Sequence, residues 1–192
     1  MNKLAGISVI TGVAGVTGAG VFYLKPWNKK ISVKQELQKL NKTILESTND
    51  SRWEVKVHFY NTNISKHPHL KINDKNQITK EELSSWCSEV LKKSNSEDLH
   101  NKAKAWCLAP VVKDKLAKEN KTILTNLNTK LQSYKSHNTN DNKVIPTTQI
   151  ENKEKGNLSD GDFKKWCETY SESELLEGAD ENYERIVHWC TT

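Results

Sequence analysis

The pattern of apolar and polar positions divides the chain into one long apolar run and a polar remainder. The run Leu4–Leu24 contains 21 residues and no charged side chain. As an α-helix it would be about 31 Å long, close to the roughly 30 Å hydrocarbon core of a bilayer. Phe22, Tyr23 and Trp27 lie at its far end, where aromatic rings favour the headgroup layer. The pattern predicts a transmembrane helix within an N-terminal anchor segment, residues 1–30.

A cleaved signal peptide is the alternative interpretation of this segment. The apolar stretch of a signal peptide is normally only about 7–15 residues long. The small residues around Ala19 also match a cleavage site poorly. Length therefore favours a permanent anchor. The glycines of the run resemble a dinucleotide-binding loop, but they do not open an amphipathic helix within a βαβ unit, so no nucleotide site is predicted.

The polar remainder contains a duplication. The block Asn41–Leu45, with the sequence NKTIL, recurs unchanged at Asn120–Leu124. Two further blocks contain Trp-Cys pairs, and these match as Trp86-Cys87 with Trp166-Cys167 and Trp106-Cys107 with Trp189-Cys190. The three separations are 79, 80 and 83 residues. Such near-constant spacing predicts two repeated helical units, residues 31–110 and 111–192.

Apolar positions in both units recur with the period of an α-helix. In the first unit one stripe contains Val33, Leu37, Leu40 and Ile44, and another contains Leu83, Trp86, Cys87, Val90 and Leu91. The stretch Trp53–Tyr60 fits both a strand and a helix, whereas its counterpart Leu127–Tyr134 fits only a helix. Since duplicated units share a fold, we predict helices at both places. The predicted fold class is therefore all-α.

Polar residues mark where two of these helices begin. Thr79 with Glu82, and Ser159 with Asp162, have the spacing of a capping box, in which each side chain bonds the backbone of the other residue. The stretch Lys135–Asn157 is rich in Asn, Thr and Lys, and we expect it to be a loop.

All four cysteines directly follow a tryptophan, and their separations within the units are 20 and 23 residues. In each unit a short polar turn, near Ser94–Ser96 or near Glu177–Asp180, separates the two helices that carry them. An antiparallel helix pair folded at this turn brings its two cysteines together. Among three possible connectivities we therefore favour the disulfides Cys87–Cys107 and Cys167–Cys190.

The same cysteines have other interpretations. Reduced cysteines are common in protein cores. Zinc is not expected, because no C-x-x-C pair occurs and the histidines lack ligand spacing, and no other cofactor is predicted. A nucleophilic thiol needs a nearby base. His100 precedes Cys107 and His188 precedes Cys190, but the other two cysteines have no such neighbour, so no catalytic residue is predicted.

The charge distribution argues against nucleic acid as a partner. The chain has 29 basic and 24 acidic residues, and the lysines are scattered among the acids without forming a basic run. A scattered surplus of this kind is typical of a solvated surface.

Two signals conflict over the membrane orientation. Lys25, Lys29 and Lys30 follow the apolar run, and only Lys3 precedes it, so the positive-inside rule favours a cytoplasmic domain. Disulfides favour an oxidising compartment and therefore the outside of the cell. The cysteine pattern leads us to expect an extracellular domain on a single-pass anchor.

The whole chain resembles the large paralogous families of uncharacterised proteins in hemotropic mycoplasmas. The resemblance rests on the Gly/Ala/Val-rich N-terminal segment, the Lys/Glu/Asn-rich helical units, the Trp-Cys pairs and the ending His188-Trp189-Cys190-Thr191. It implies a wall-less bacterium with a single membrane and a protein exposed at, or released from, the cell surface. A host-surface protein is the partner that we expect from the anchor and the paired cysteines. No catalytic residues carry over, because those families have no established activity.

Taken together, these features favour a membrane-anchored protein that is not an enzyme and that has a surface-interaction or antigenic role. Its membrane contact is made by residues 4–24. Two alternatives remain: a membrane-tethered cytoplasmic scaffold and an unrecognised enzyme.

Overall fold

The computed structural model describes residues 31–138 and 141–192 of the chain. The expected membrane segment, Leu4–Leu24, lies outside the described residues. The described part consists of α-helices and short 3-10 helices, and it contains no β-strand, which confirms the all-α class. No helix in these two ranges is both long enough and apolar enough to cross a bilayer.

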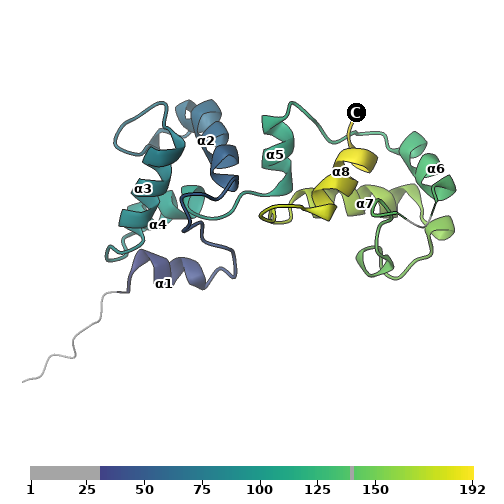
Figure 1. Ribbon diagram of the computed structural model, residues 1–192, viewed down its shortest axis with the longest axis horizontal. Coiled ribbons are helices and arrows are strands. Elements are labelled where there is room, and N and C mark those ends of the chain that lie inside the picture. The colour runs from purple at the N-terminus through teal and green to yellow at the C-terminus, as the bar shows by residue number, and fades with distance from the viewer. Residues whose placement is uncertain (1–30, 139–140) are drawn as a thin grey trace, which may run out of the picture.

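Two sets of four α-helices follow one another along the chain (Figure 1). The first set, coloured purple to teal, comprises α1 (Val33–Gln38), α2 (Arg52–Asn63), α3 (Lys80–Val90) and α4 (Glu97–Trp106). The second set, coloured teal-green to yellow, comprises α5 (Val112–Lys118), α6 (Asn128–Ser136), α7 (Asp160–Ser171) and α8 (Glu181–Cys190). We call these two sets the first half and the second half.

The predicted helical stripe that reaches Ile44 is wrong at its end. Helix α1 stops at Gln38, and Asn41 follows with a φ of 51°. This left-handed conformation suits Asn and ends a helix. Ile44 instead forms an isolated β-bridge with Leu108, so it belongs to an extended segment and not to a helix. The second half repeats the same termination at Asn120, where φ is 57°.

The two capping boxes are present as predicted. Thr79 Oγ1 accepts a hydrogen bond from the Glu82 amide, and the Glu82 carboxylate accepts one from the Thr79 amide. Ser159 and Asp162 exchange the equivalent pair of bonds at the start of α7. Each box satisfies amides that the first helical turn leaves without an intrahelical partner.

A long connection follows the second helix of each half. In the first half it contains the 3-10 helices η1 (Ile64–Lys66) and η2 (Pro68–Leu70), and in the second half η3 (Thr147–Gln149) and η4 (Lys155–Asn157). The predicted loop Lys135–Asn157 therefore begins two residues inside α6 and contains two short helical turns. Polarity alone predicts solvent exposure, but it does not exclude such turns.

A buried tyrosine anchors each of these connections. Tyr60 Oη accepts a hydrogen bond from the Ile72 amide at 3.0 Å and donates one to the Lys75 carbonyl oxygen at 2.7 Å. Tyr134 Oη bonds a different point of its connection, accepting from the Ile145 amide at 3.2 Å and donating to the Ile145 carbonyl oxygen at 3.4 Å. Each tyrosine thus fixes part of its connection from the core.

Each half has its own apolar core around its cysteines. One residue departs from this division, since Val55 of α2 packs with the core of the second half. Helix α5 packs against α2 and α7, so it connects the two cores. The halves are therefore in direct contact.

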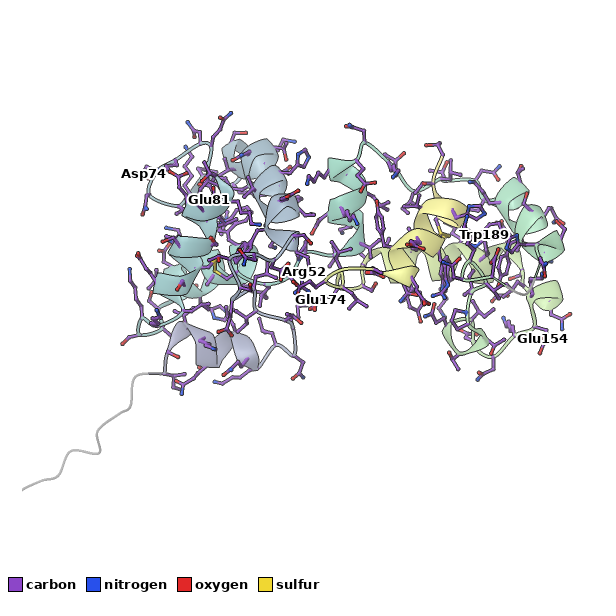
Figure 2. All side chains as sticks on the ribbon, viewed as in Figure 1. Arg52, Asp74, Glu81, Glu154, Glu174 and Trp189 are labelled. Carbon is purple, nitrogen blue, oxygen red and sulfur yellow. A yellow bond between two sulfur atoms is a disulfide. The ribbon has the colours of Figure 1, made fainter. Side chains whose placement is uncertain are left out.

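Polar contacts reinforce this junction, where Figure 2 shows Arg52 and Glu174 close together. Arg52 Nη1 donates a hydrogen bond to the Leu175 carbonyl oxygen, and Asp50 holds the guanidinium through Nε and Nη2. The Glu174 carboxylate accepts a hydrogen bond from the Thr43 amide at 3.0 Å. Arg52 and Asp50 are both buried, so the loss of one partner should lower the free energy of unfolding more than the loss of a surface ion pair would.

Candidate interaction grooves beside the two disulfides

Both cysteine pairs form disulfides in the core. Cys87 bonds Cys107 and Cys167 bonds Cys190, with Cα–Cα distances of 5.6 and 5.8 Å. These are the pairs that the turn positions favour. All four residues have no solvent exposure. Each disulfide links the last two helices of its half, α3 to α4 and α7 to α8.

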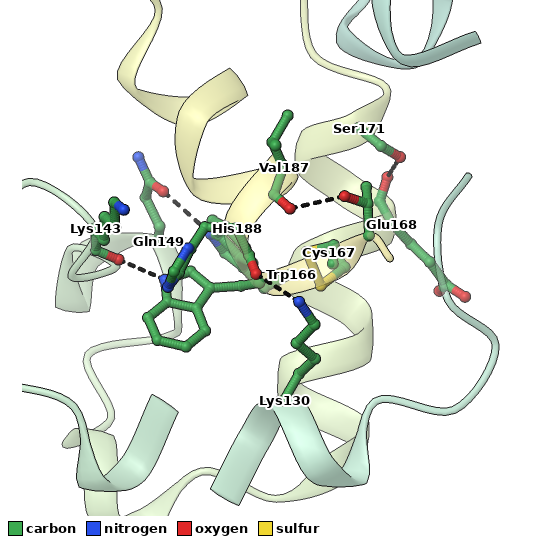
Figure 3. The surroundings of a disulfide bond; sticks show 12 residues. Lys130, Lys143, Gln149, Trp166, Cys167, Glu168, Ser171, Val187 and His188 are labelled. Carbon is green, nitrogen blue, oxygen red and sulfur yellow. Dashed lines mark hydrogen bonds between the residues drawn. A yellow bond between two sulfur atoms is a disulfide. The ribbon is translucent and has the colours of Figure 1, made fainter. Parts of the chain in front are cut away.

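The tryptophan before the second cysteine of each pair points into the core. Trp106 Nε1 donates a hydrogen bond to the Leu70 carbonyl oxygen at 2.8 Å. Trp189 Nε1 donates one to the Lys143 carbonyl oxygen. Figure 3 shows Lys143, Trp166 and His188 around the disulfide of Cys167. The Trp106 and Trp189 indoles contact the anchoring tyrosines edge to face, with centroid distances of 4.8 and 5.1 Å. Their role is therefore to hold the long connection against the disulfide-linked helices.

The tryptophan before the first cysteine has a different position. Trp86 lines a groove of about 360 Å³ between α3 and the connection before it. The other lining residues are Ile72, Asn73, Lys75, Ile78, Glu81, Glu82, Ser85 and Glu89. Figure 2 shows Glu81 on α3 and Asp74 on the adjoining connection. We call this hollow the first groove.

The second half has a hollow at the equivalent place, which we call the second groove. Its volume is about 190 Å³, and it is lined by Thr148, Gln149, Ile150, Glu151, Asp162, Lys165, Trp166, Thr169 and Tyr170. The indole of Trp166 takes the place of Trp86, and Ile150 takes the place of Ile72. Both grooves thus arise from the same arrangement of a helix and its preceding connection.

One ion pair recurs beside both grooves. Lys75 Nζ lies 2.5 Å from the Glu82 carboxylate, and Lys153 Nζ lies 2.5 Å from the Asp162 carboxylate. The hydrogen bond from Lys75 lowers the pKa of Glu82, and that from Lys153 lowers the pKa of Asp162. Both acids therefore stay ionised at neutral pH.

The two grooves differ in exposed aromatic surface and in charge. Trp86 is half-buried. Trp166 is only 2% exposed, because it packs against Tyr170 and donates from Nε1 to Gln149. Only the first groove has Glu89, which Thr169 replaces in the second. The first groove therefore combines an accessible indole with an acidic lining.

Neither groove corresponds to a site predicted from the sequence. The candidate bases from the sequence were His100 and His188, but all four cysteines form disulfides, so neither histidine has a thiol to activate. The His188 ring packs on Trp189 with a centroid distance of 4.3 Å, and burial lowers its pKa. The repeated Trp-Cys pairs were the one signal that pointed to the groove-lining indoles.

The described residues contain no cluster of His, Cys, Asp or Glu suited to hold a metal ion. Comparison with protein-family models, curated proteins and solved structures finds no match to this chain.

Proposed function

We propose that the chain is a membrane-anchored interaction protein, displayed outside the cell, whose first groove binds a basic segment of a partner. The observation that carries this proposal is the repetition of the groove in both halves, together with the accessible indole and surplus of acids in the first. Residues 4–24 supply the anchor.

The extracellular orientation is supported by the disulfides. Structural disulfides persist in oxidising compartments and are rare in the cytosol of mesophiles. The lysines after the apolar run argue for the opposite orientation. We give the disulfides more weight, because both are fully buried and each links two core helices of its half.

The chemistry of the first groove favours a cationic ligand. Glu81, Glu82 and Glu89 line it, and Lys75 is the one lining base. Since Lys75 pairs with Glu82, the other two carboxylates are available to a partner. An Arg or Lys side chain can stack on the Trp86 indole while it pairs with one of these acids. In a host-associated bacterium, basic segments of host surface proteins are the partners we expect.

The orientation is tested on intact cells. External protease should remove residues 31–192 without lysis, and alkylation without reductant should label no cysteine. A domain that survives until lysis, with four alkylated thiols, would instead support the alternative of a cytoplasmic scaffold.

The groove is tested by binding. Titration with tetra-arginine should shift the Trp86 indole N–H resonance, whereas tetra-glutamate should not. Glu89→Lys should weaken tetra-arginine binding about tenfold or more, since it reverses a charge at the site. Thr169→Lys places a lysine at the equivalent position of the second groove, with a charge change of one unit rather than two, and serves as the control. Equal effects of both variants would refute a specific role for the first groove.

A further inference from the structure

A third hollow lies where the two halves meet. It has a volume of about 370 Å³ and is lined by Leu40, Lys42, Lys56, Lys104, Leu108, Ala109, Val111 and Asp114. The lining comes from the segment after α1, from α2, α4 and α5, and from the link between α4 and α5. Neither half forms it alone. We call it the junction pocket.

Lys56 is the central group of the junction pocket. Its side chain is only 7% exposed, and its Nζ donates a hydrogen bond to the Ala105 carbonyl oxygen at 2.7 Å. One bond leaves an ammonium group with two further donors. Burial lowers the pKa of Lys56 to about 8; Asp114 opposes this change and Lys42 adds to it. The pocket therefore holds a buried ammonium group whose desolvation Asp114 does not fully offset.

The second half provides an internal comparison. Lys130 occupies the place of Lys56 on α6, and its Nζ donates to the His188 carbonyl oxygen at 2.9 Å. The bond from this lysine to the last helix is therefore part of the repeated fold. Lys121, the counterpart of Lys42, pairs with Glu119. In the first half, Lys42 and Lys104 instead line the pocket that holds Lys56.

The charges that line the junction pocket are unbalanced. Three ammonium groups face one carboxylate. That carboxylate, Asp114, already accepts a hydrogen bond from the Val111 amide at 3.0 Å. In the described part of the chain, no carboxylate oxygen lies within 4.0 Å of the Nζ atom of Lys42, Lys56 or Lys104. The surplus is two positive charges.

We propose that the junction pocket binds the phosphate group of a phosphate monoester. Such a group carries close to two negative charges at pH 7 and offers three acceptor oxygens, which match the surplus charge and the three lysines. A sulfate monoester carries only one negative charge, so it would leave one of the two surplus positive charges of the pocket unneutralised. The apolar lining from Leu40, Leu108 and Val111 provides space for the organic part of the ligand.

The test uses the full-length chain in a non-ionic detergent, with phenyl phosphate as the probe. Isothermal titration calorimetry should give a Kd below about 1 mM. Phenyl sulfate should bind about tenfold more weakly, and inorganic phosphate should compete with the probe. Nitrogen-detected NMR should show a rise in the pKa of Lys56 when the probe is bound, because an anion stabilises the ammonium form.

Variants of the two exposed lysines separate binding from folding. Lys42→Gln and Lys104→Gln should each weaken phenyl phosphate binding about tenfold, since each removes a charge-assisted hydrogen bond. Lys92→Gln removes the same charge from an exposed position outside the pocket and should leave binding unchanged. The proposal is overturned by a lack of binding at millimolar probe, by equal affinity for sulfate and phosphate esters, or by equal losses in all three variants.

Discussion

Arg52 Nη1 donates a hydrogen bond to the carbonyl oxygen of Leu175 across a distance of 3.1 Å, and this bond joins the two halves of the molecule. The guanidinium can reach that carbonyl because Asp50 holds its other edge, with Nη2 2.8 Å from the carboxylate. Burial alone would raise the pKa of Asp50, but its hydrogen bonds with Arg52 outweigh burial and lower it. The pair is thus ionised, and Arg52 uses it to bridge the two halves.

Arg52→Met should destabilise the chain by about 3–5 kcal/mol, because it leaves the Asp50 carboxylate buried without its partner. Urea denaturation measures this loss. Hydrogen exchange should also accelerate in α2 and α5, which pack together at the junction. Arg185→Met is the matched control, since Arg185 pairs with the exposed Glu181 inside the second half. A similar loss of stability in both variants would contradict a special role for Arg52.

Removal of either disulfide should cost about 3 kcal/mol, as expected for loops of 20 and 23 residues. The paired variants are Cys87→Ala with Cys107→Ala, and Cys167→Ala with Cys190→Ala. Calorimetry should show a lower Tm for each. Hydrogen exchange should increase mainly in the half that lost its bond, because each disulfide lies in a separate core. Uniform loosening of both halves would show that the cores do not act separately.

Tyr60→Phe should lower the free energy of unfolding by about 1–3 kcal/mol, since it leaves the buried Ile72 amide without its acceptor. The same change at Tyr134 removes longer bonds and should cost less. The amide exchange rate of Ile72 reports the loss directly. Because Ile72 and Lys75 line the first groove, Tyr60→Phe should also weaken tetra-arginine binding. An unchanged Ile72 exchange rate would disprove the anchoring role of Tyr60.

The stability of the chain should respond to Lys56 at alkaline pH. Burial lowers the pKa of Lys56 from 10.5 to about 8, and the charged groups around it are Asp114, Lys42 and Lys104. Between these two pH values the unfolded chain holds a proton that the folded chain has lost, so the contribution of Lys56 becomes more favourable as pH rises.

Denaturation at several pH values measures this contribution as the difference between the wild type and Lys56→Met. The difference should move by about 3 kcal/mol in favour of the wild type between pH 7.5 and 10.5. Lys130→Met, at the equivalent position of the second half, controls for the lost carbonyl contact. A difference that does not change with pH would show that the pKa of Lys56 is the same in the folded and unfolded chains.

Periodicity predicted the helices well where one face is buried. It resolved the ambiguity of Trp53–Tyr60 because the second copy, Leu127–Tyr134, lacks alternation. It failed at Ile44, since an apolar stripe does not reveal that Asn41 adopts a left-handed conformation and ends the helix. An Asn four residues after the last buried apolar residue of α1 was the available signal.

The candidate sites were less predictable than the fold. Lys42, Lys56 and Lys104 are widely separated along the chain and follow no motif. The fold of the first half brings them together, and α5 of the second half completes the pocket with Asp114.

The attachment of the first described residues affects how the chain bears mechanical load. The Ile31 carbonyl oxygen accepts a hydrogen bond from the Asn95 amide, and the Val33 amide donates to the Lys93 carbonyl oxygen. A chain pulled from its N-terminus therefore transmits tension into the turn between α3 and α4. The Cys87–Cys107 bond closes that hairpin covalently and keeps its 20-residue loop from extending, which removes about 65 Å of possible lengthening. Under shear, the first half would yield by losing hydrogen bonds, while its covalent crosslink would keep the α3–α4 hairpin closed.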